Sequence, residues 1–320
     1  MNPHPKILHL LSNWKWTERS EPVVDLAMAQ QDLGVHAILV CEKGPDPSPV
    51  PDLASNAKGK GLERVIPLSG MSKHFNAISL LRSVFGLRQI LTAEAPHVIH
   101  CHMRNAHLLA GLACKKKLGS ILVRPDYNPE DIGGDYKNNM SLKYFTTGII
   151  VVADQAKESS RLEKLPEGSI EVIEPGIDVE RFSPERPLER EIHFELPDSH
   201  AFVAGMITRI RQTRRLDVPL KAIQLLNDTH HHLRLLLVGR GREGAFESVV
   251  DRPASEMGIR DRIIPAGYCQ GDELVAALRA MDVLLYPMPG TDKTCRTVRE
   301  ALAAGVPVIA PQIGFLPQLI

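Results

Sequence analysis

Short apolar runs alternate with stretches of helical period along almost the whole chain, and this alternation constrains the fold more than any other feature. The runs are KILHLL, HAILVC, RVIPL, HVIHC, SILVR, GIIVV and IEVI, followed after residue 200 by AFVAGMI, LRLLLVG, RIIPAG, DVLLYP and VPVIAP. Strands that are apolar at every position are covered on both faces, and strands that alternate with helices form parallel sheets. We therefore predict an α/β protein with doubly wound parallel sheets.

The runs fall into two sets, separated by a charged segment that is rich in proline. This segment, PGIDVERFSPERPLEREIHFELPDSH, occupies residues 175–200 and has the composition of an interdomain linker. A chain of 320 residues, 43% of them apolar, is long enough for about two domains. We place the first Rossmann-like domain at residues 1–185 and the second at 186–320, and we expect them to face a ligand-binding cleft.

Charge and cysteine content exclude several classes of function. The 38 basic residues balance 38 acidic residues, so no global charge favours nucleic acid. The five cysteines are scattered without a Cys-x-x-Cys pair, which is typical of a reducing compartment. No run reaches about 18 apolar residues, and the N-terminal sequence does not have the pattern of a signal peptide. We expect a cytoplasmic protein that does not span a membrane.

The stretch VGRGREG matches the G-x-G-x-x-G pattern of dinucleotide-binding turns through Gly239, Gly241 and Gly244. An NAD site also needs an acid at the end of the next strand, but that strand ends in Ala266 and Gly267. The other interpretation is a tight turn in which glycine permits close packing. A nucleotide that approaches Gly239 is compatible with both interpretations.

Four arginines follow the strand AFVAGMI on one loop, namely Arg209, Arg211, Arg214 and Arg215. Open α/β sheets bind ligands outside the carboxyl ends of their strands, and a guanidinium group binds phosphate through two parallel hydrogen bonds. The alternative is a solvated loop without a ligand. We expect Arg209 and Arg214 to bind phosphate.

The segment TDKTCRTVREALAAGVPVIAP, residues 291–311, predicts a loop, a helix and a short strand. Thr291 or Asp292 can cap the helix, and Gly305 fits its C-terminal end. Glu300 lies beside the predicted core face of this helix. That core face consists of Val298, Ala301, Leu302 and Gly305.

Asp292 and Glu300 are eight positions apart, which a helix would span with about 12 Å. The two acids of a glycosidase lie about 5 to 9.5 Å apart, so we do not expect this pair to act on one bond. A nucleotide-sugar could bridge it, with its diphosphate at the N–H groups of Lys293, Thr294 and Cys295 and its ribose at Glu300. The alternatives are an N-cap for Asp292 and an exposed carboxylate for Glu300.

The stretch HCHMRNAH ends a predicted strand, and its residues His100 and His102 point to the same face of the predicted sheet. No acid or cysteine near them in the sequence completes a metal site, so we predict no metal ligands there. His102 lies at the expected edge of the cleft, where it could contact a substrate. The run HHH at residues 230–232 precedes a strand and fits a solvated loop.

The stretch HFNAISLLRSVFGLRQIL carries an apolar stripe with Arg82 and Arg88 beside it. The stripe consists of Phe75, Ile78, Leu81, Val84, Phe85 and Ile90. We expect a helix whose stripe faces the core. The alternative is a surface helix that touches a membrane carrying a lipid-linked acceptor, assisted by the lysines at 115–117.

About residues 170–315 resemble the retaining nucleotide-sugar glycosyltransferases of family 4, also called group 1, which have the GT-B fold. The resemblance rests on EVIEPGIDVERFSP, LLLVGRG, DRIIPAG, DVLLYP and REALAAGVPVIAP, and on Arg209 and Arg214, spaced as the family's Arg-x4-Lys. It implies a UDP-, GDP- or ADP-sugar donor, a glycan or lipid-linked acceptor, no obligatory metal cofactor and retention of the anomeric configuration. It also implies that Glu300 holds the ribose and that Asp292 lies beside the transferred sugar.

Several positions depart from the family's pattern. Asp292 replaces a longer glutamate, Arg214 replaces a lysine, and Arg19 and Ser20 stand where a glycine pair lets the diphosphate approach. Asp126 stands where a histidine is usual, and could orient an acceptor hydroxyl. Members usually continue beyond GFLPQLI, so the resemblance predicts a second domain without its usual C-terminal end. The alternative function is a catalytically impaired nucleotide-sugar-binding or interaction protein.

These inferences define one expected site for a cytoplasmic sugar transferase that could bind peripherally at the inner face of a membrane. The expected catalytic residues are Asp126, His102 and Asp292. The expected donor-binding residues are Arg209, Arg214, Gly239, Lys293, Thr294, Cys295 and Glu300. A nicotinamide-dependent enzyme is the remaining alternative, and bound NAD would identify it.

Overall fold

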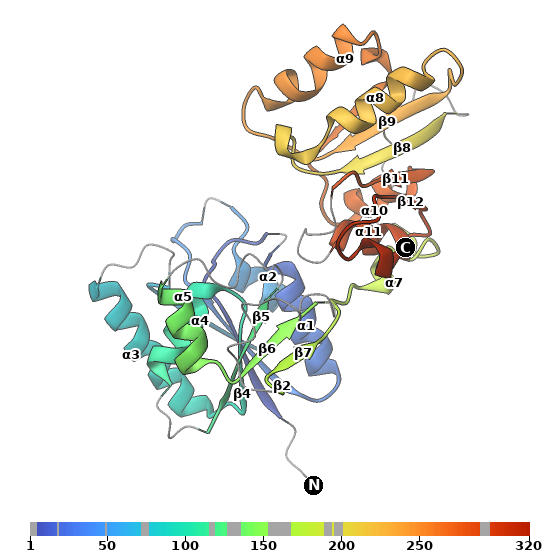
Figure 1. Cartoon of the computed structure of the whole chain (residues 1–320). Helices are drawn as coiled ribbons and strands as arrows, with labels where there is room; N and C mark the ends of the chain where they lie inside the picture. Colours follow the sequence, from blue (N-terminus) through green and yellow to red (C-terminus); the bar gives the residue numbers. More distant parts are fainter. Residues whose placement is uncertain are drawn as a thin grey trace. The chain divides into compact units, whose positions relative to one another are not determined.

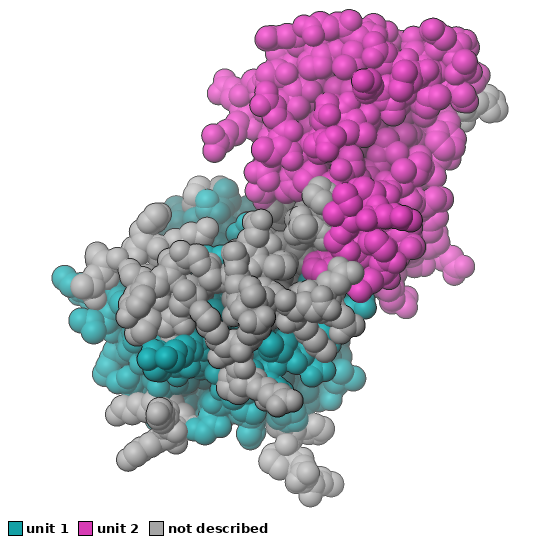
Figure 2. Space-filling model, viewed as in Figure 1, with its two compact units in different colours: residues 1–175 teal, residues 176–320 magenta. Residues whose placement is uncertain are grey.

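The computed structural model describes two compact units, residues 1–175 and 176–320 (Figure 2). The described residues are 5–17, 19–48, 50–71, 77–114, 119–126, 136–152, 168–188, 194, 201–288 and 295–320. The units divide at Pro175, whereas the sequence analysis placed the boundary after residue 185. The difference arises because Phe182, in the short helix α7 (Val179–Phe182), is buried in the core of the second unit.

The first unit is built on one parallel sheet of seven strands, in the order β3-β2-β1-β4-β5-β6-β7 (Figure 1). The strands are β1 (Lys6–Leu11), β2 (His36–Glu42), β3 (Arg64–Leu68), β4 (Val98–Cys101), β5 (Ile121–Asp126), β6 (Gly148–Val151) and β7 (Ile170–Val172). Each of them lies within one of the apolar runs, or overlaps most of it. The prediction of parallel strands from continuous apolar runs is confirmed.

Helices cover both faces of this sheet. The evidence is that successive residues of one strand pack in two different hydrophobic cores, one on each face. Leu8 and Leu10 of β1 pack in a core with Leu87 and Leu109, while Leu11 packs in a second core on the opposite face. Helices α3 and α4 contribute to the first core, and α1 and α2 contribute to the second. The helices are α1 (Glu21–Asp32), α2 (Leu53–Gly59), α3 (Ala77–Glu94), α4 (Arg104–Ala113) and α5 (Tyr136–Phe145).

The second unit repeats this plan with a five-stranded parallel sheet in the order β10-β9-β8-β11-β12. Its strands are β8 (Phe202–Ile207), β9 (Leu233–Val238), β10 (Ile263–Gly267), β11 (Val283–Leu285) and β12 (Val308–Ile309). Its helices, besides α7, are α8 (Asp217–Leu226), α9 (Arg252–Glu256), α10 (Asp272–Arg279), α11 (Arg296–Ala303) and α12 (Leu316–Leu319). Shorter helical turns are η2 (Gln212–Arg214), η3 (Glu247–Asp251) and η4 (Arg260–Arg262). The expected pair of doubly wound α/β units is confirmed.

Both sheets reverse their winding direction at one point. In the first sheet this point lies between β1 and β4, and in the second it lies between β8 and β11. At such a point the connections leave to opposite faces, which opens a crevice at the carboxyl ends of the two strands. Each unit therefore has one edge at which the topology favours ligand binding.

Helix α3 turns only part of its expected apolar stripe to the core. Val84 and Ile90 pack against the core, and Phe75 lies outside the described residues. The exposed members are Ile78, Leu81 and Phe85, at 66%, 69% and 62% accessibility. The expectation of a core-facing stripe is correct for the inner side of the helix and wrong for these three residues. Among the described residues, no helix combines the length and the hydropathy that a membrane span requires.

Candidate functional site

The arginine loop of the second unit leaves the carboxyl end of β8. Ile210, only 2% exposed, anchors the loop in the core, and the backbone N–H of Arg214 donates to the Arg211 carbonyl at 3.0 Å. Arg209 is exposed, whereas Arg214 is partly buried at the end of the turn η2. The structure thus places both predicted phosphate-binding residues at the carboxyl end of a strand, as the sequence analysis expected.

Gly239 directly follows β9, and its backbone packs against this loop. Its φ is +142°, and a Cβ atom at this position would lie 1.7 Å from the carbonyl oxygen of Thr208. A Cβ on Gly241 would lie 2.6 Å from the carbonyl oxygen of Ile210. Only glycine permits this approach, so the interpretation of the turn as a close-packing device is confirmed. The contact of Gly239 with a nucleotide stays a prediction.

Helix α11 begins later than expected. It starts at Arg296, because Cys295 has the left-handed conformation, with φ 45° and ψ 40°, which interrupts a helix. The prediction that Thr291 or Asp292 caps the helix is therefore wrong, and Cys295 holds the capping position without a side-chain hydrogen bond to the helix. The expected C-terminal end is confirmed, since Gly305 has φ +74°.

Glu300 lies in the second turn of α11 and is only 3% exposed. The Nε of Arg296 donates to its Oε1 at 2.6 Å, within one helical turn. Burial of a carboxylate is costly unless it is paired, and Arg296 supplies that partner. The alternative of an exposed helix carboxylate is wrong. A carboxylate has about four lone-pair sites, so it can accept several hydrogen bonds at once.

Arg296 is a residue that the sequence analysis missed. The signal was available, because an arginine and a glutamate four positions apart face each other on a helix. The family pattern singles out the two acids and leaves this basic residue unmarked. Its charge adds to the positive potential of a helix N-terminus.

The topology brings the arginine loop and α11 to one edge of the second sheet. The loop follows β8, the connection to α11 follows β11, and these two strands are hydrogen-bonded neighbours at the switch point. Arg209, Arg214 and Glu300 therefore lie on the connections that border one crevice. The predicted residues Asp292, Lys293 and Thr294 lie outside the described residues.

In the first unit, Asp126 is the last residue of β5, at the carboxyl edge of the sheet. The structure describes the backbone of Asp126 but not its side chain. Ser20 stands in place of an expected glycine, yet it is fully buried, and its Oγ accepts the backbone N–H of Thr17 at 2.7 Å. This side chain is therefore turned inward and holds the local turn of the chain. The adjacent Arg19 is exposed.

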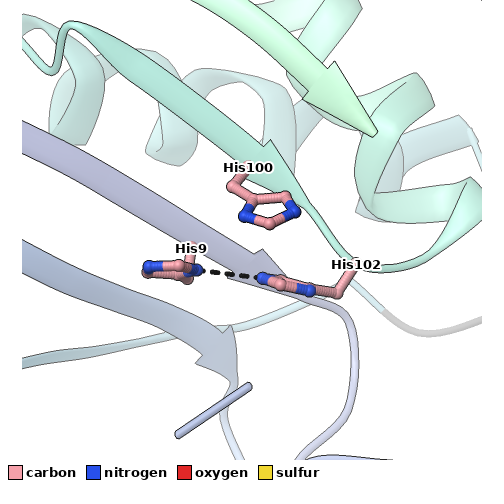
Figure 3. A group of neighbouring side chains, drawn as sticks. All are labelled: His9, His100 and His102. Atoms are coloured by element: carbon pink, nitrogen blue, oxygen red, sulfur yellow. Dashed lines mark hydrogen bonds between the residues drawn. The ribbon is translucent and has the colours of Figure 1, made fainter. Parts of the chain in front are cut away.

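His102 forms a cluster with His9 and His100 at the switch point of the first sheet (Figure 3). His9 and His100 are cross-strand partners in β1 and β4, and the Nδ1 of His9 lies 3.0 Å from the Nε2 of His102. Burial lowers the pKa of His9 to about 4 and that of His100 to about 3. Burial also holds the pKa of His102 well below its usual value. All three imidazoles are therefore neutral at neutral pH.

The sequence analysis missed His9, which lies 91 residues before His100. A local signal existed, because His9 is a polar residue in the middle of the apolar run KILHLL. Its partners became visible only through the pairing of β1 with β4. The expected contact of His102 with a substrate stays a prediction.

Comparison with known proteins matches both units to sugar-transferring families. Residues 23–181 match the model of "Glycosyltransferase Family 4", and residues 189–320 match that of "Glycosyl transferases group 1". The chain is 29% identical to a D-inositol 3-phosphate glycosyltransferase of Mycolicibacterium gilvum, over 53% of this chain and 37% of that protein. An uncharacterized glycosyltransferase of Methanocaldococcus jannaschii is 23% identical over 83% of this chain and 70% of its own length.

A solved structure shares the fold over nearly the whole chain. HepE of Anabaena, determined in complex with UDP and glucose, has a TM-score of 0.72 at 17% identity, over 99% of this chain and 83% of that chain. The match to the D-inositol 3-phosphate enzyme, in contrast, spans well under half of that protein's length. Three observations point to glycosyltransferases with the GT-B fold. They are the two family models, the motifs around the arginine loop and α11, and the two Rossmann-like units. Each of the two units therefore matches the model of a glycosyltransferase family, and the chain has the two α/β units of GT-B structures.

Proposed function

We propose that this protein transfers a sugar from a nucleoside diphosphate-sugar to a glycan or lipid-linked acceptor, with retention of the anomeric configuration. The observation that carries the proposal is the joint position of the arginine loop and the buried Glu300 at the switch point of the second sheet. That arrangement offers positive charge for a diphosphate and a hydrogen-bond acceptor for hydroxyl groups. The solved complex of HepE with UDP and glucose supports a donor of this chemical class.

The reaction breaks the bond between the anomeric carbon and a diphosphate oxygen, which keeps the electron pair. Arg209, Arg214 and the N–H groups at the start of α11 stabilise the negative charge that develops on this leaving group. The acceptor oxygen forms the new bond on the same face of the sugar, and its proton passes to an oxygen of the departing diphosphate. Because cationic side chains neutralise the diphosphate, we propose that the transfer itself needs no obligatory metal cofactor.

The other site residues have distinct proposed roles. Glu300 accepts hydrogen bonds from the ribose, with Arg296 holding one of its oxygens. Asp292 lies beside the transferred sugar, and Asp126 orients the acceptor hydroxyl. If the protein instead binds nucleotide-sugars without catalysis, it would bind the donor without consuming it. A measurement of donor turnover therefore distinguishes the two functions.

A thermal-shift titration with UDP, GDP, ADP and NAD tests the donor site. A ligand at 100 times its dissociation constant raises the free energy of unfolding by about 2.7 kcal/mol. We expect one nucleoside diphosphate to stabilise the protein, and Glu300→Gln and Arg209→Ala to weaken that effect. The exposed residues Glu256 and Arg252 of α9 provide matched controls, and Glu256→Gln and Arg252→Ala should leave it unchanged. Stabilisation by NAD alone would contradict the proposal.

The exposed side of α3 favours an acceptor that is anchored in a membrane. Ile78, Leu81 and Phe85 are three and four positions apart, so they share one helical face, and the exposed Arg82 lies beside them. An apolar strip with an adjacent cation is typical of helices that lie in an anionic membrane surface. Arg88 serves the fold instead, because it donates to the carbonyls of Leu112 and Ala113 at the end of α4. We propose that α3 contacts the membrane that carries the acceptor.

A further inference from the structure

The histidine cluster consists of residues of the first unit only, and its position follows from the topology. His9 lies in β1, His100 lies opposite it in β4, and His102 follows two residues later. Residues two apart in a strand point to the same face, so the three rings meet on one side of the sheet (Figure 3). On that side, helix α1 supplies Gln30, whose Oε1 lies 2.7 Å from the Nε2 of His9.

The spacing of the ring nitrogens suits a metal ion. One nitrogen from each histidine lies within 4.8 Å of the other two, and His9 Nδ1 and His102 Nε2 are 3.0 Å apart. Zinc–nitrogen bonds of about 2.0 to 2.1 Å in tetrahedral geometry separate ligand nitrogens by about 3.3 Å. One pair already has nearly that separation. The third nitrogen needs a shift of at most about 1.5 Å, which a small ring rotation provides.

The hydrogen-bonding pattern prepares His9 for coordination. The Oε1 atom of Gln30 can only accept, so His9 Nε2 carries the hydrogen and Nδ1 turns its lone pair to the cluster. Metal-binding histidines usually donate their second N–H to such an oxygen, which fixes the ring and its tautomer. Gln30 therefore occupies the position of an outer-shell partner.

Two further ring nitrogens of the cluster are buried without a partner. The Nε2 of His100 and the Nδ1 of His102 make no hydrogen bond with any residue that the structure describes. Buried polar atoms are rarely left in this state, and such exceptions call for an explanation. For the Nε2 of His100 a bound cation supplies one, because it requires a neutral imidazole with an available lone pair. On His102 the nitrogen that faces His9, and so the expected ligand, is Nε2 and not the unpartnered Nδ1.

The ligand set also selects the kind of metal. The cluster offers three neutral nitrogens and, within the described residues, no carboxylate. Calcium and magnesium prefer oxygen ligands, whereas imidazole suits zinc and its neighbours among the transition metals. Three histidines with an open fourth position form a known type of zinc site.

We propose that His9, His100 and His102 bind a Zn²⁺ ion, with Gln30 holding the ring of His9. The ion connects β1 to β4 at the switch point of the first sheet, and its fourth position is available to water or another ligand. Because His102 coordinates the ion, its relation to any substrate is indirect. This proposal does not depend on the proposed transferase function.

Zinc titration of the full chain tests the proposal, after removal of metal with EDTA and in competition with a chromophoric chelator. The exposed run His230–His232 is a second source of imidazole, so the titration uses a background with all three replaced by glutamine. We expect one Zn²⁺ per chain in this background. His9→Gln and His102→Gln should lower the affinity at least about 100-fold, and Gln30→Leu about 10- to 100-fold. The matched control His107→Gln replaces a buried histidine outside the cluster and should leave the affinity unchanged.

X-ray absorption at the zinc edge provides a measurement that needs no substitution in the cluster. In the same background, we expect three imidazole ligands with zinc–nitrogen distances of about 2.0 to 2.1 Å. This result decides the question if the His9→Gln protein does not fold. The proposal is overturned if that background binds no stoichiometric zinc, if two or fewer imidazoles coordinate it, or if a folded His9→Gln protein binds zinc as tightly as its parent.

Discussion

Arg296 and Glu300 form an ion pair across one turn at the start of α11, with 2.6 Å between Nε and Oε1. The side chain of Glu300 is 4% exposed, and that of Arg296 is 23% exposed. The pair fixes the carboxylate at the edge of the second sheet, where the arginine loop also lies. A buried acid is thus held in place before any ligand arrives, which is a form of preorganisation.

The effects of replacing Arg296 and Glu300 on the free energy of unfolding should not be additive. Arg296→Met leaves a buried carboxylate without this partner, and we expect a loss of about 1 to 3 kcal/mol in the free energy of unfolding. Glu300→Gln combined with Arg296→Met should cost less than the sum of the single changes, with a coupling of about 1 kcal/mol. Urea denaturation of the four proteins measures this coupling. Additive effects would show that the two side chains do not interact.

Substitution of Gly239 tests the close packing of the turn against the arginine loop. In Gly239→Ala the new Cβ would meet the Thr208 carbonyl oxygen at 1.7 Å, so we expect a loss of about 3 kcal/mol or more. Gly244 is a matched control, because it has φ +71° and open space, with nothing within 4 Å, where a Cβ would stand. Gly244→Ala should cost only about 1 kcal/mol. Equal changes in thermal midpoint would contradict the proposed role of Gly239.

A buried histidine outside the histidine cluster, His107, should make the first unit sensitive to acid. Burial lowers the pKa of His107 to about 3, with the nearby Arg124 adding to the effect, and the ring lies 3.0 Å from the Thr146 hydroxyl. The unfolded chain, with a histidine pKa near 6.5, takes up this proton first as pH falls. The contribution of His107 to the free energy of unfolding is therefore fully present above about pH 6.5, and it is lost as the pH falls towards 3.

The size of this effect can be isolated with one variant. Between pH 6.5 and pH 5, we expect the neutral His107 to account for a loss of about 1.5 to 2 kcal/mol. His107→Gln keeps a hydrogen-bonding side chain that does not titrate, so its unfolding free energy should fall less over this range. Denaturation curves at several pH values measure the difference. Parallel pH profiles for the two proteins would rule out His107 as an acid-sensitive group.

The exposed face of α3 should govern binding to anionic vesicles. Replacement of Ile78, Leu81 and Phe85 by serine should reduce co-sedimentation with vesicles of anionic phospholipid about tenfold or more, since each side chain buries apolar area in the bilayer. Arg82→Gln should weaken binding and reduce its dependence on salt. Leu225, 74% exposed in the second unit, provides the control Leu225→Ser, which should bind as the parent does. Unchanged binding of the triple variant would remove α3 from the membrane contact.

The fold was predictable from sequence because its main signals are local. A continuous apolar run such as LRLLLV identifies a buried parallel strand without knowledge of its neighbours. The order of strands within each sheet needed the structure, since it depends on pairing. The domain boundary was harder to place, because Phe182 belongs to the second core although the charged linker sequence surrounds it.

The site was predictable only where one segment carries its own signal. The arginine loop and the helix around Glu300 each have such a signal. The start of α11 was not predictable, because a left-handed non-glycine residue such as Cys295 has no clear signature in sequence. The histidine cluster was missed for a different reason. Its members come from two strands, and no local pattern connects His9 to His100.

The most direct test of the central claim is to locate the bound donor. A photoreactive derivative of the nucleoside diphosphate that stabilises the protein would be crosslinked and mapped by mass spectrometry. We predict labelling in the arginine loop, residues 208–216, or in the connection to α11, with competition by the unmodified nucleotide and loss in Arg209→Ala. Competed labelling confined to residues 1–175 would contradict the assignment of the donor site to the second unit.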